Sequence, residues 1–164
     1  MKLDSLQSLF VEEIADLQDA EDQLISALPK MAGAANSPEL RQAIEDHLEE
    51  TKAQAERLKR VVEGLDTRVP SKTCAAMKGL IKEGEEIIKE TGDPCVKDAA
   101  LIAAAQRVEH YEIAAYGCAR TFGELLGASS AVDLLQQSLN EEAAADKKLT
   151  SLAESLVNQE AASV

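Results

Sequence analysis

Tryptophan is absent from the sequence, and aromatic residues make up only 2% of its 164 residues. Aromatic side chains are enriched in β-strands, so their scarcity argues against a sheet protein. The hydrophobic residues are instead mostly Ala, Leu, Ile and Val. Ala and Leu, like the abundant Glu, Gln and Lys, are strong helix formers. We therefore predict an all-α protein whose length suits one domain, residues 1–164.

Basic residues are also few: 17 Lys and Arg stand against 30 Asp and Glu, which leaves a net charge of −13. So acidic a surface repels nucleic acid and anionic membranes and attracts cations. No apolar run approaches the roughly 20 residues that span a bilayer. The N-terminal segment MKLDSLQSLFVEEIADL carries acids where a secretory signal needs an apolar stretch. We expect neither a nucleic acid nor a membrane as a partner.

Cysteine is scarce and irregularly spaced. Cys74, Cys95 and Cys118 are an odd number, lie far apart and contain no Cys-x-x-Cys pair. This pattern is neither a disulfide framework nor a zinc knuckle. A reducing cytoplasm is the compartment that we expect.

Helix start and stop signals divide the chain into segments. Ser37-Pro38 and Asp93-Pro94 each place a capping residue before a proline at the first helical position. Pro29 is expected to kink or end the first helix. Together with the apolar periodicity, these signals predict helices over residues of about 4–33, 38–63, 73–91, 94–126 and 130–158.

The lengths of the connections predict the topology. Short turns join the first two and the last two long helices, so each pair forms an antiparallel hairpin. The connection between the hairpins, residues 65–93, is long and carries its own shorter helix. One such crossover distinguishes the ferritin-like four-helix bundle from a plain up-and-down bundle.

Acidic residues interrupt the apolar stripe of each long helix. A lone Glu more commonly lies on a solvated face, and a lone His is more commonly a core residue than a ligand. In the two Glu-Glu pairs, Glu49 could face the interior instead of its neighbour at position 50, and Glu141 instead of its neighbour at position 142. The polar residues that we assign to the stripes as candidate metal ligands are Glu21, His47, Glu50, Glu109, Glu112, Glu142 and Asp146.

These acidic residues are expected at a similar height along the axis of the bundle. Counted from the turns at 1.5 Å per residue, the acids of both hairpins come within a turn or two of the middle of the bundle. Burying several carboxylates together costs several kcal/mol each unless they are protonated or bind a cation. Two divalent metals with His47 as the nitrogen ligand would resolve this conflict. Gln54 and Tyr116 are candidates to support these ligands, and we expect His110 on the surface or beside a ligand.

Four segments in order resemble the bacterial YciE/YciF stress-protein family: AEDQLISALPKMA, HLEETKAQAERL, VEHYEIAAYGCAR and LNEEAAADKKLTSLAE. The resemblance covers residues 4 to about 157. It implies a fold similar to that of ferritins and rubrerythrins, a role in bacterial stress and a homodimer. It also implies the ferritin ligand pattern, in which Glu21 matches the first helix, Glu109 the third, and Glu112 the additional rubrerythrin glutamate.

The other two long helices depart from that pattern, which has Glu-x-x-His on the second and fourth helices. Glu50 matches the second helix, but its histidine, His47, precedes it by three residues instead of following it. Glu142 matches the fourth helix, but Asp146 stands in the region where a histidine belongs. The resulting site is richer in oxygen, which argues against iron oxidation and peroxide reduction by the usual mechanism.

Two functions compete. The first is a stress-response oxidoreductase with two iron ions, or iron and manganese or other divalent metals, that acts on oxygen or peroxide as a small oxidant. The second is a non-catalytic structural or binding bundle that retains a vestigial metal site. A third function, iron storage in a cage, would need 24 subunits and is the weakest of the three.

Overall fold

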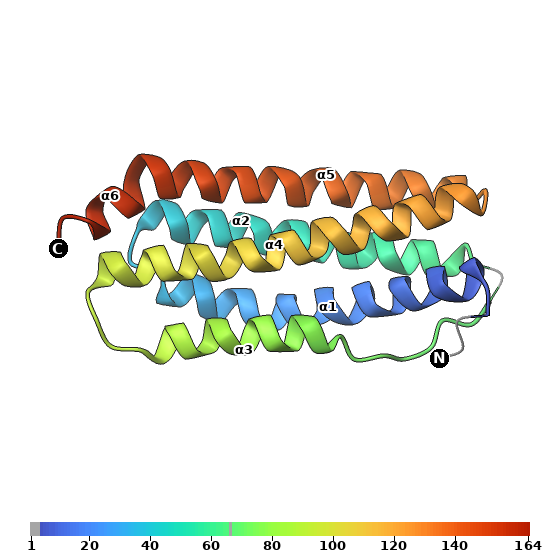
Figure 1. The fold of residues 1–164 in the computed structure, drawn as a ribbon, viewed down its shortest axis with the longest axis horizontal. Coiled ribbons are helices and arrows are strands. Elements are labelled where there is room, and N and C mark those ends of the chain that lie inside the picture. The colour runs from blue at the N-terminus through green and yellow to red at the C-terminus, as the bar shows by residue number, and fades with distance from the viewer. Residues whose placement is uncertain (1–3, 66) are drawn as a thin grey trace.

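The computed structural model describes residues 4–65 and 67–164. The first three residues of the N-terminal segment and one position of the 65–93 connection lie outside it. Within the described residues the chain is helical and contains no strand (Figure 1). The helices are α1 (Leu6–Ala34), α2 (Pro38–Glu63), α3 (Ala75–Lys89), α4 (Pro94–Leu125), α5 (Ser129–Leu152), a π-helical turn (Ala153–Val157) and α6 (Asn158–Ala161).

Side chains cap the starts of three long helices. Ser5, Ser37 and Asp93 each accept a hydrogen bond from a backbone N–H in the first turn of α1, α2 and α4. Each bond satisfies a donor that has no partner within its helix. Gly127 follows α4 with φ +71°, a backbone conformation that residues with a side chain rarely adopt. The chain can therefore reverse there into α5.

Two boundaries differ from the sequence-based expectation, whereas α1 ends at Ala34, close to the expected residue 33. Pro29 lies inside α1 and does not end the helix. The crossover helix starts at Ala75 because the thiol of Cys74 accepts a hydrogen bond from its first turn and caps it. Regular α-helix in α5 stops at Leu152, where the wider π-helical turn begins.

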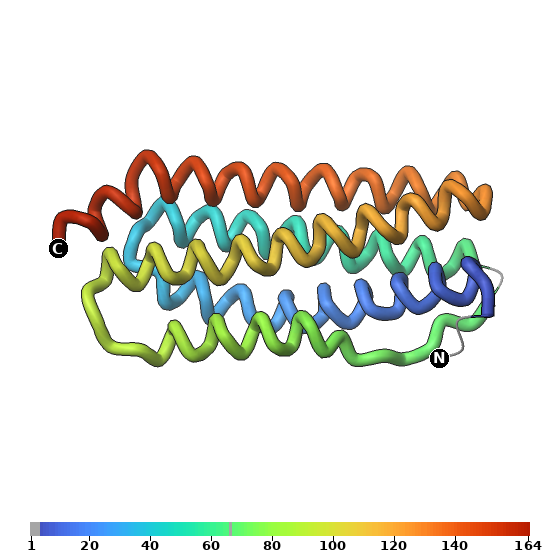
Figure 2. Tube along the Cα trace, in the orientation of Figure 1, coloured from blue at the N-terminus to red at the C-terminus, as the bar shows by residue number. Residues whose placement is uncertain are grey.

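The helices form the expected bundle of two antiparallel hairpins. The α1–α2 hairpin packs against the α4–α5 hairpin through contacts of α1 with α4 and of α2 with α5. The crossover helix α3 lies outside the bundle along α1 and α4 (Figure 2). None of the described helices combines the length and the apolar character that a membrane-spanning segment needs.

The bundle interior has apolar ends and a polar middle. One hydrophobic cluster, at the α1–α2 turn, contains Leu24, Leu40, Ile44, Leu101 and Leu149 among others. The other, at the α4–α5 turn, is built around Phe10, Ile14, Leu17, Leu58 and Leu135. Between them lie the buried polar side chains Glu21, His47, Thr51, Gln54, Glu109, Glu112, Ser138 and Glu142.

Candidate metal centre

Each long helix contributes ionisable side chains to this middle layer. They are Glu21 from α1, His47 from α2, Glu109 and Glu112 from α4, and Glu142 from α5, and none is more than 7% exposed. Each follows or precedes an apolar residue of its helix by three or four positions, which places it on the core-facing side. Helical periodicity therefore brings these groups inward together.

Four of these side chains converge on one point. His47, Glu109, Glu112 and Glu142 each offer a ligand atom, and these atoms all lie within 4.8 Å of one another. The Nε2 atom of His47 is 3.4 Å from Oε1 of Glu109 and 4.0 Å from Oε2 of Glu142. A group of one nitrogen and three carboxylate donors at this spacing could hold a metal ion.

The cluster leaves much of its hydrogen-bonding capacity unused. Both oxygens of Glu112, one oxygen each of Glu21, Glu109 and Glu142, and both ring nitrogens of His47 have no hydrogen-bond partner within the described part of the chain. Buried polar atoms are nearly always paired, so a group of unpaired ones calls for an explanation. A bound cation would satisfy them, and these donors fit one.

Burial raises the pKa of the Glu21, Glu109 and Glu112 carboxyls well above the usual range. Neighbouring carboxylates, Glu142 among them, raise all three pKa values further. The pKa of Glu142 is also raised by burial, although the nearby His47 opposes that effect. Without a cation the layer therefore retains protons, and a cation that binds must replace them.

Two uncharged side chains hold individual carboxylates in place. The hydroxyl of Tyr116 donates a hydrogen bond to Oε1 of Glu21. The amide of Gln54 donates to Oε1 of Glu142 and, at 3.2 Å, to Oε2 of the neighbouring Glu141. Both donors are fully buried. The second oxygen of each carboxylate, Oε2 of Glu21 and Oε2 of Glu142, has no hydrogen-bond partner among the described residues.

Arg57 and Glu141 form a separate ion pair beside this layer. Arg57 donates to both carboxylate oxygens of Glu141, at 2.6 and 2.7 Å, and to the hydroxyl of Ser138 at 2.9 Å. Such a two-pronged pair is strong and directional. It directs the guanidinium group to Glu141. Of the two neighbouring acids at 141 and 142, Glu142 is therefore the one that enters the cluster.

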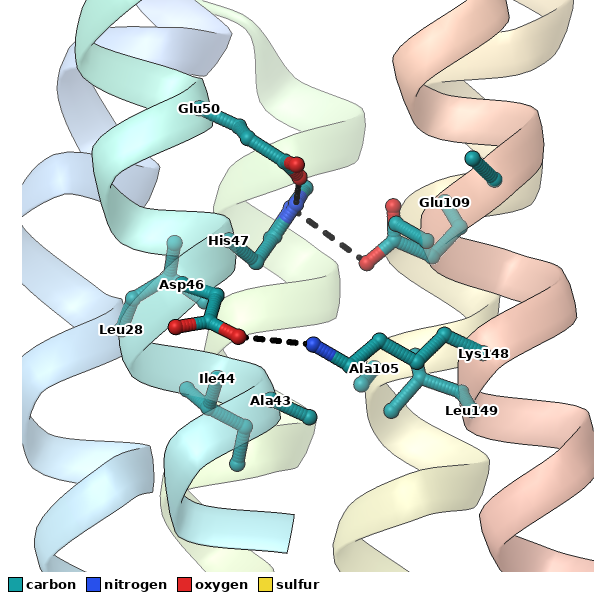
Figure 3. A pocket seen from close by; sticks show the side chains of 12 residues that line it. Leu28, Ala43, Ile44, Asp46, His47, Glu50, Ala105, Glu109, Lys148 and Leu149 are labelled. Carbon is teal, nitrogen blue, oxygen red and sulfur yellow. Dashed lines mark hydrogen bonds and ion pairs between the residues drawn. The ribbon is translucent and has the colours of Figure 1, made fainter. Parts of the chain in front are cut away.

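The structure leaves three of the seven candidate ligands outside the four-residue cluster: Glu21, Glu50 and Asp146. Glu21 is fully buried in the same layer, where it accepts the hydrogen bond from Tyr116. The carboxylate of Glu50 is 3.5 Å from Nδ1 of His47 but is 47% exposed, and this interaction with His47 lowers its pKa (Figure 3). Asp146 accepts a hydrogen bond from Gln106 and lies 3.3 Å from the exposed His110. Glu50 borders the cluster from its solvent side, and Asp146 belongs to a neighbouring network between α4 and α5.

Comparison with known proteins places the chain in a family. The family model described as "Domain of unknown function (DUF892)" matches residues 5–162. The chain belongs to the DUF892 family. Protein YciF of Escherichia coli (strain K12) is 46% identical over 162 residues, 98% of each chain. The family resemblance seen in the sequence is therefore confirmed.

Solved structures of similar proteins share the fold. The crystal structure described as that of the E. coli stress protein YciF matches with a TM-score of 0.92, covering 95% of this chain and 99% of that one. A second relative, YcfI from Rhodopseudomonas palustris, is described as a proposed structural protein. It is 42% identical, has a TM-score of 0.86 and covers 92% of this chain and 97% of its own.

Sequence reasoning missed the partly buried arginine of this DUF892 chain. Arg57 follows Gln54 by three residues and therefore shares its face of α2, which was the available signal. Its partner Ser138 precedes Glu142 by four residues on α5, and was missed in the same way. Long basic side chains can reach across an interface from the edge of a stripe, so periodicity alone does not predict their partners.

Proposed function

We propose that this protein is a metal-binding stress-response protein with a di-iron, or iron/manganese, carboxylate site that reduces peroxide or activates oxygen. The observation that carries the proposal is the buried cluster of His47, Glu109, Glu112 and Glu142 with its unpaired ligand atoms. The description of the relative YciF as a stress protein supports the physiological part.

His47, Glu109, Glu112 and Glu142 would hold the first ion, and the buried carboxylate of Glu21 in the same layer would contribute to the second. Bound iron or manganese supplies redox chemistry with oxygen or peroxide. The chain itself orients Glu21 through Tyr116, orients Glu142 through Gln54, and keeps these carboxylates buried. One imidazole among carboxylates favours such transition metals over Ca²⁺ or Mg²⁺, which prefer oxygen alone.

Metal analysis tests this proposal. Protein produced with iron and manganese in the medium should contain up to two ions per chain, and apo-protein should take up Fe(II) anaerobically to the same stoichiometry. Fe(II)-loaded protein should then consume added peroxide faster than Fe(II) in the same buffer. Purified protein that neither contains nor binds a transition metal would defeat the proposal.

The alternative is a non-catalytic structural bundle with a vestigial metal site. The raised carboxyl pKa values support it, because protonated carboxyls tolerate burial without a cation. The description of the relative YcfI points the same way. Under this alternative, removing metal with a chelator leaves the unfolding temperature unchanged. Under the first proposal the temperature falls, because a ligand that binds only the native state stabilises it.

We further propose a cytoplasmic homodimer, as the family resemblance implies. Light scattering on the purified protein should give twice the monomer mass of 17.6 kDa. A particle of 24 subunits would instead support iron storage in a cage. Fractionation of cells that produce the protein tests its compartment.

A further inference from the structure

A cavity leads from the molecular surface to the metal centre between α2 and α5. Its volume is about 100 Å³. Buried His47 and Glu109 form part of its wall, and so do the half-exposed Asp46 and Lys148 (Figure 3). Because one cavity contacts both buried and exposed side chains, it connects the cluster with the surface.

Small side chains keep this route open. Ala43, Ala105, Ala144 and Ala145 contribute to the wall. A broader surface depression between α2 and α5 shares Ala43, Ala144 and Lys148 with the cavity. Ala144 is itself exposed and lies where the depression meets the cavity. A larger side chain at this position would therefore narrow the opening.

The charges along the route favour a cation. Asp46 and Lys148 form an ion pair at 2.8 Å across the opening and offset each other. The remaining ionisable groups of the wall are Glu50, Glu109 and the imidazole of His47. Glu50 is the exposed carboxylate next to His47, so an incoming cation meets it before it meets the buried ligands.

A second cavity also reaches Glu109, between α1, α3 and α4, but it is smaller and more apolar. Its volume is about 30 Å³, and its wall includes Leu80, Ile81 and Ile88. One water molecule needs roughly 10–15 Å³ of such space. The α1/α3/α4 cavity thus has room for about two to three waters, whereas the α2/α5 cavity has room for several and offers more polar partners.

We propose that the α2/α5 cavity is the passage through which a partly hydrated divalent cation reaches the metal centre. Glu50 is the first carboxylate that binds the cation on its way in. This inference rests on the proposed metal site. It adds a route, a role for Glu50 outside the cluster and a residue, Ala144, that controls the rate of uptake.

The experiment compares Co(II) uptake by three variants of the full chain. Ala144→Phe narrows the opening, and Ala143→Phe makes the same change one residue away, at an exposed position that lines neither cavity. Ala27→Phe fills the α1/α3/α4 cavity. Visible absorption of bound Co(II) is followed by stopped flow, and the bound amount is measured at equilibrium.

We expect Ala144→Phe to slow uptake by about tenfold or more, equivalent to at least about 1.4 kcal/mol in the barrier, with an unchanged amount bound. Ala143→Phe and Ala27→Phe should match the unmodified protein. Equal rates for Ala144→Phe and Ala143→Phe, or slowing by Ala27→Phe alone, would overturn the passage and leave the metal site standing. Failure of the unmodified protein to bind Co(II) would overturn both. If Ala144→Phe lowers the amount bound, the smaller Ala144→Leu is judged by the same rate criterion.

Discussion

The ends of the bundle and its middle layer use opposite kinds of side chain to fill the same interior. At the ends, Phe10, Leu40 and Leu135 are removed from water by apolar neighbours. In the middle, Glu21, Glu112 and Glu142 are removed from water just as fully. Apolar burial stabilises the fold, whereas burial of carboxyl groups opposes it. The ends therefore stabilise the bundle, whereas the middle layer opposes folding unless its carboxyl groups are protonated or bind a cation.

Truncating an apolar end should have the largest effect. Phe10→Ala removes a fully buried ring that also contacts the position where a Cβ of Gly123 would lie. We expect the free energy of unfolding of the metal-free protein to fall by about 3–5 kcal/mol, measured by urea denaturation. Leu125→Ala at an exposed position is the control and should change it by less than about 0.5 kcal/mol.

Replacing a carboxyl group of the middle layer should increase the free energy of unfolding of the metal-free protein instead of lowering it. Glu112→Leu exchanges a buried carboxyl, both of whose oxygens have no partner among the described residues, for an apolar group of similar size. We expect the metal-free protein to gain about 1–4 kcal/mol of stability and to lose Fe(II) binding. Glu45→Leu on the exposed surface should change neither. A loss of stability in metal-free Glu112→Leu would contradict the contrast between ends and middle.

Removing a supporting donor should weaken metal binding without removing a ligand. Gln54→Leu deletes the hydrogen bonds to Glu142 and Glu141. We expect the dissociation constant for Co(II) to rise about 10–100-fold, measured by competition with a chelator. Gln42→Leu, on the exposed face of the same helix, is the matched control. Unchanged affinity in Gln54→Leu would show that Glu142 needs no support.

The buried carboxyl groups of the middle layer should make the stability of the metal-free protein depend on pH. The folded-state pKa values of Glu21, Glu109 and Glu112 lie above the usual range. Their contribution to stability is therefore complete at low pH and is lost as pH rises through these raised values. The metal-free unfolding temperature should fall as pH rises above the usual range of carboxyl pKa values, whereas metal affinity should rise, because ligands bind metal when deprotonated. The unfolding temperature of metal-free Glu112→Leu should depend less on pH than that of the unmodified protein. An equal pH dependence would argue against attributing the effect to the buried carboxyl groups.

Much of the fold could be predicted because its signals are local. The capping serines and the Pro38 and Pro94 positions act within one turn of their helices. The long crossover could be predicted from its length alone. The end of α5 was less predictable, since the π-helical turn at Ala153–Val157 has no comparable local signal.

The sequence could predict which face of each helix carries the candidate ligands, but not which of the polar residues on that face reaches the cluster. Successive helical residues are about 100° apart around the axis, so residues three or four apart still differ by roughly 40–60°. That difference separates His47, which is buried, from Glu50, which borders solvent. It also separates Glu142 from Asp146, whose partners are Gln106 and His110.

By itself the sequence determined the helices, their order and the presence of acids at one level of the interior, because helix signals and periodicity act over a few residues. Only the tertiary structure decided which acids share a point, that Arg57 pairs with Glu141, and that a cavity reaches His47 from between α2 and α5. These features depend on the rotation and spacing of helices far apart in the chain. Packing of the whole bundle sets both.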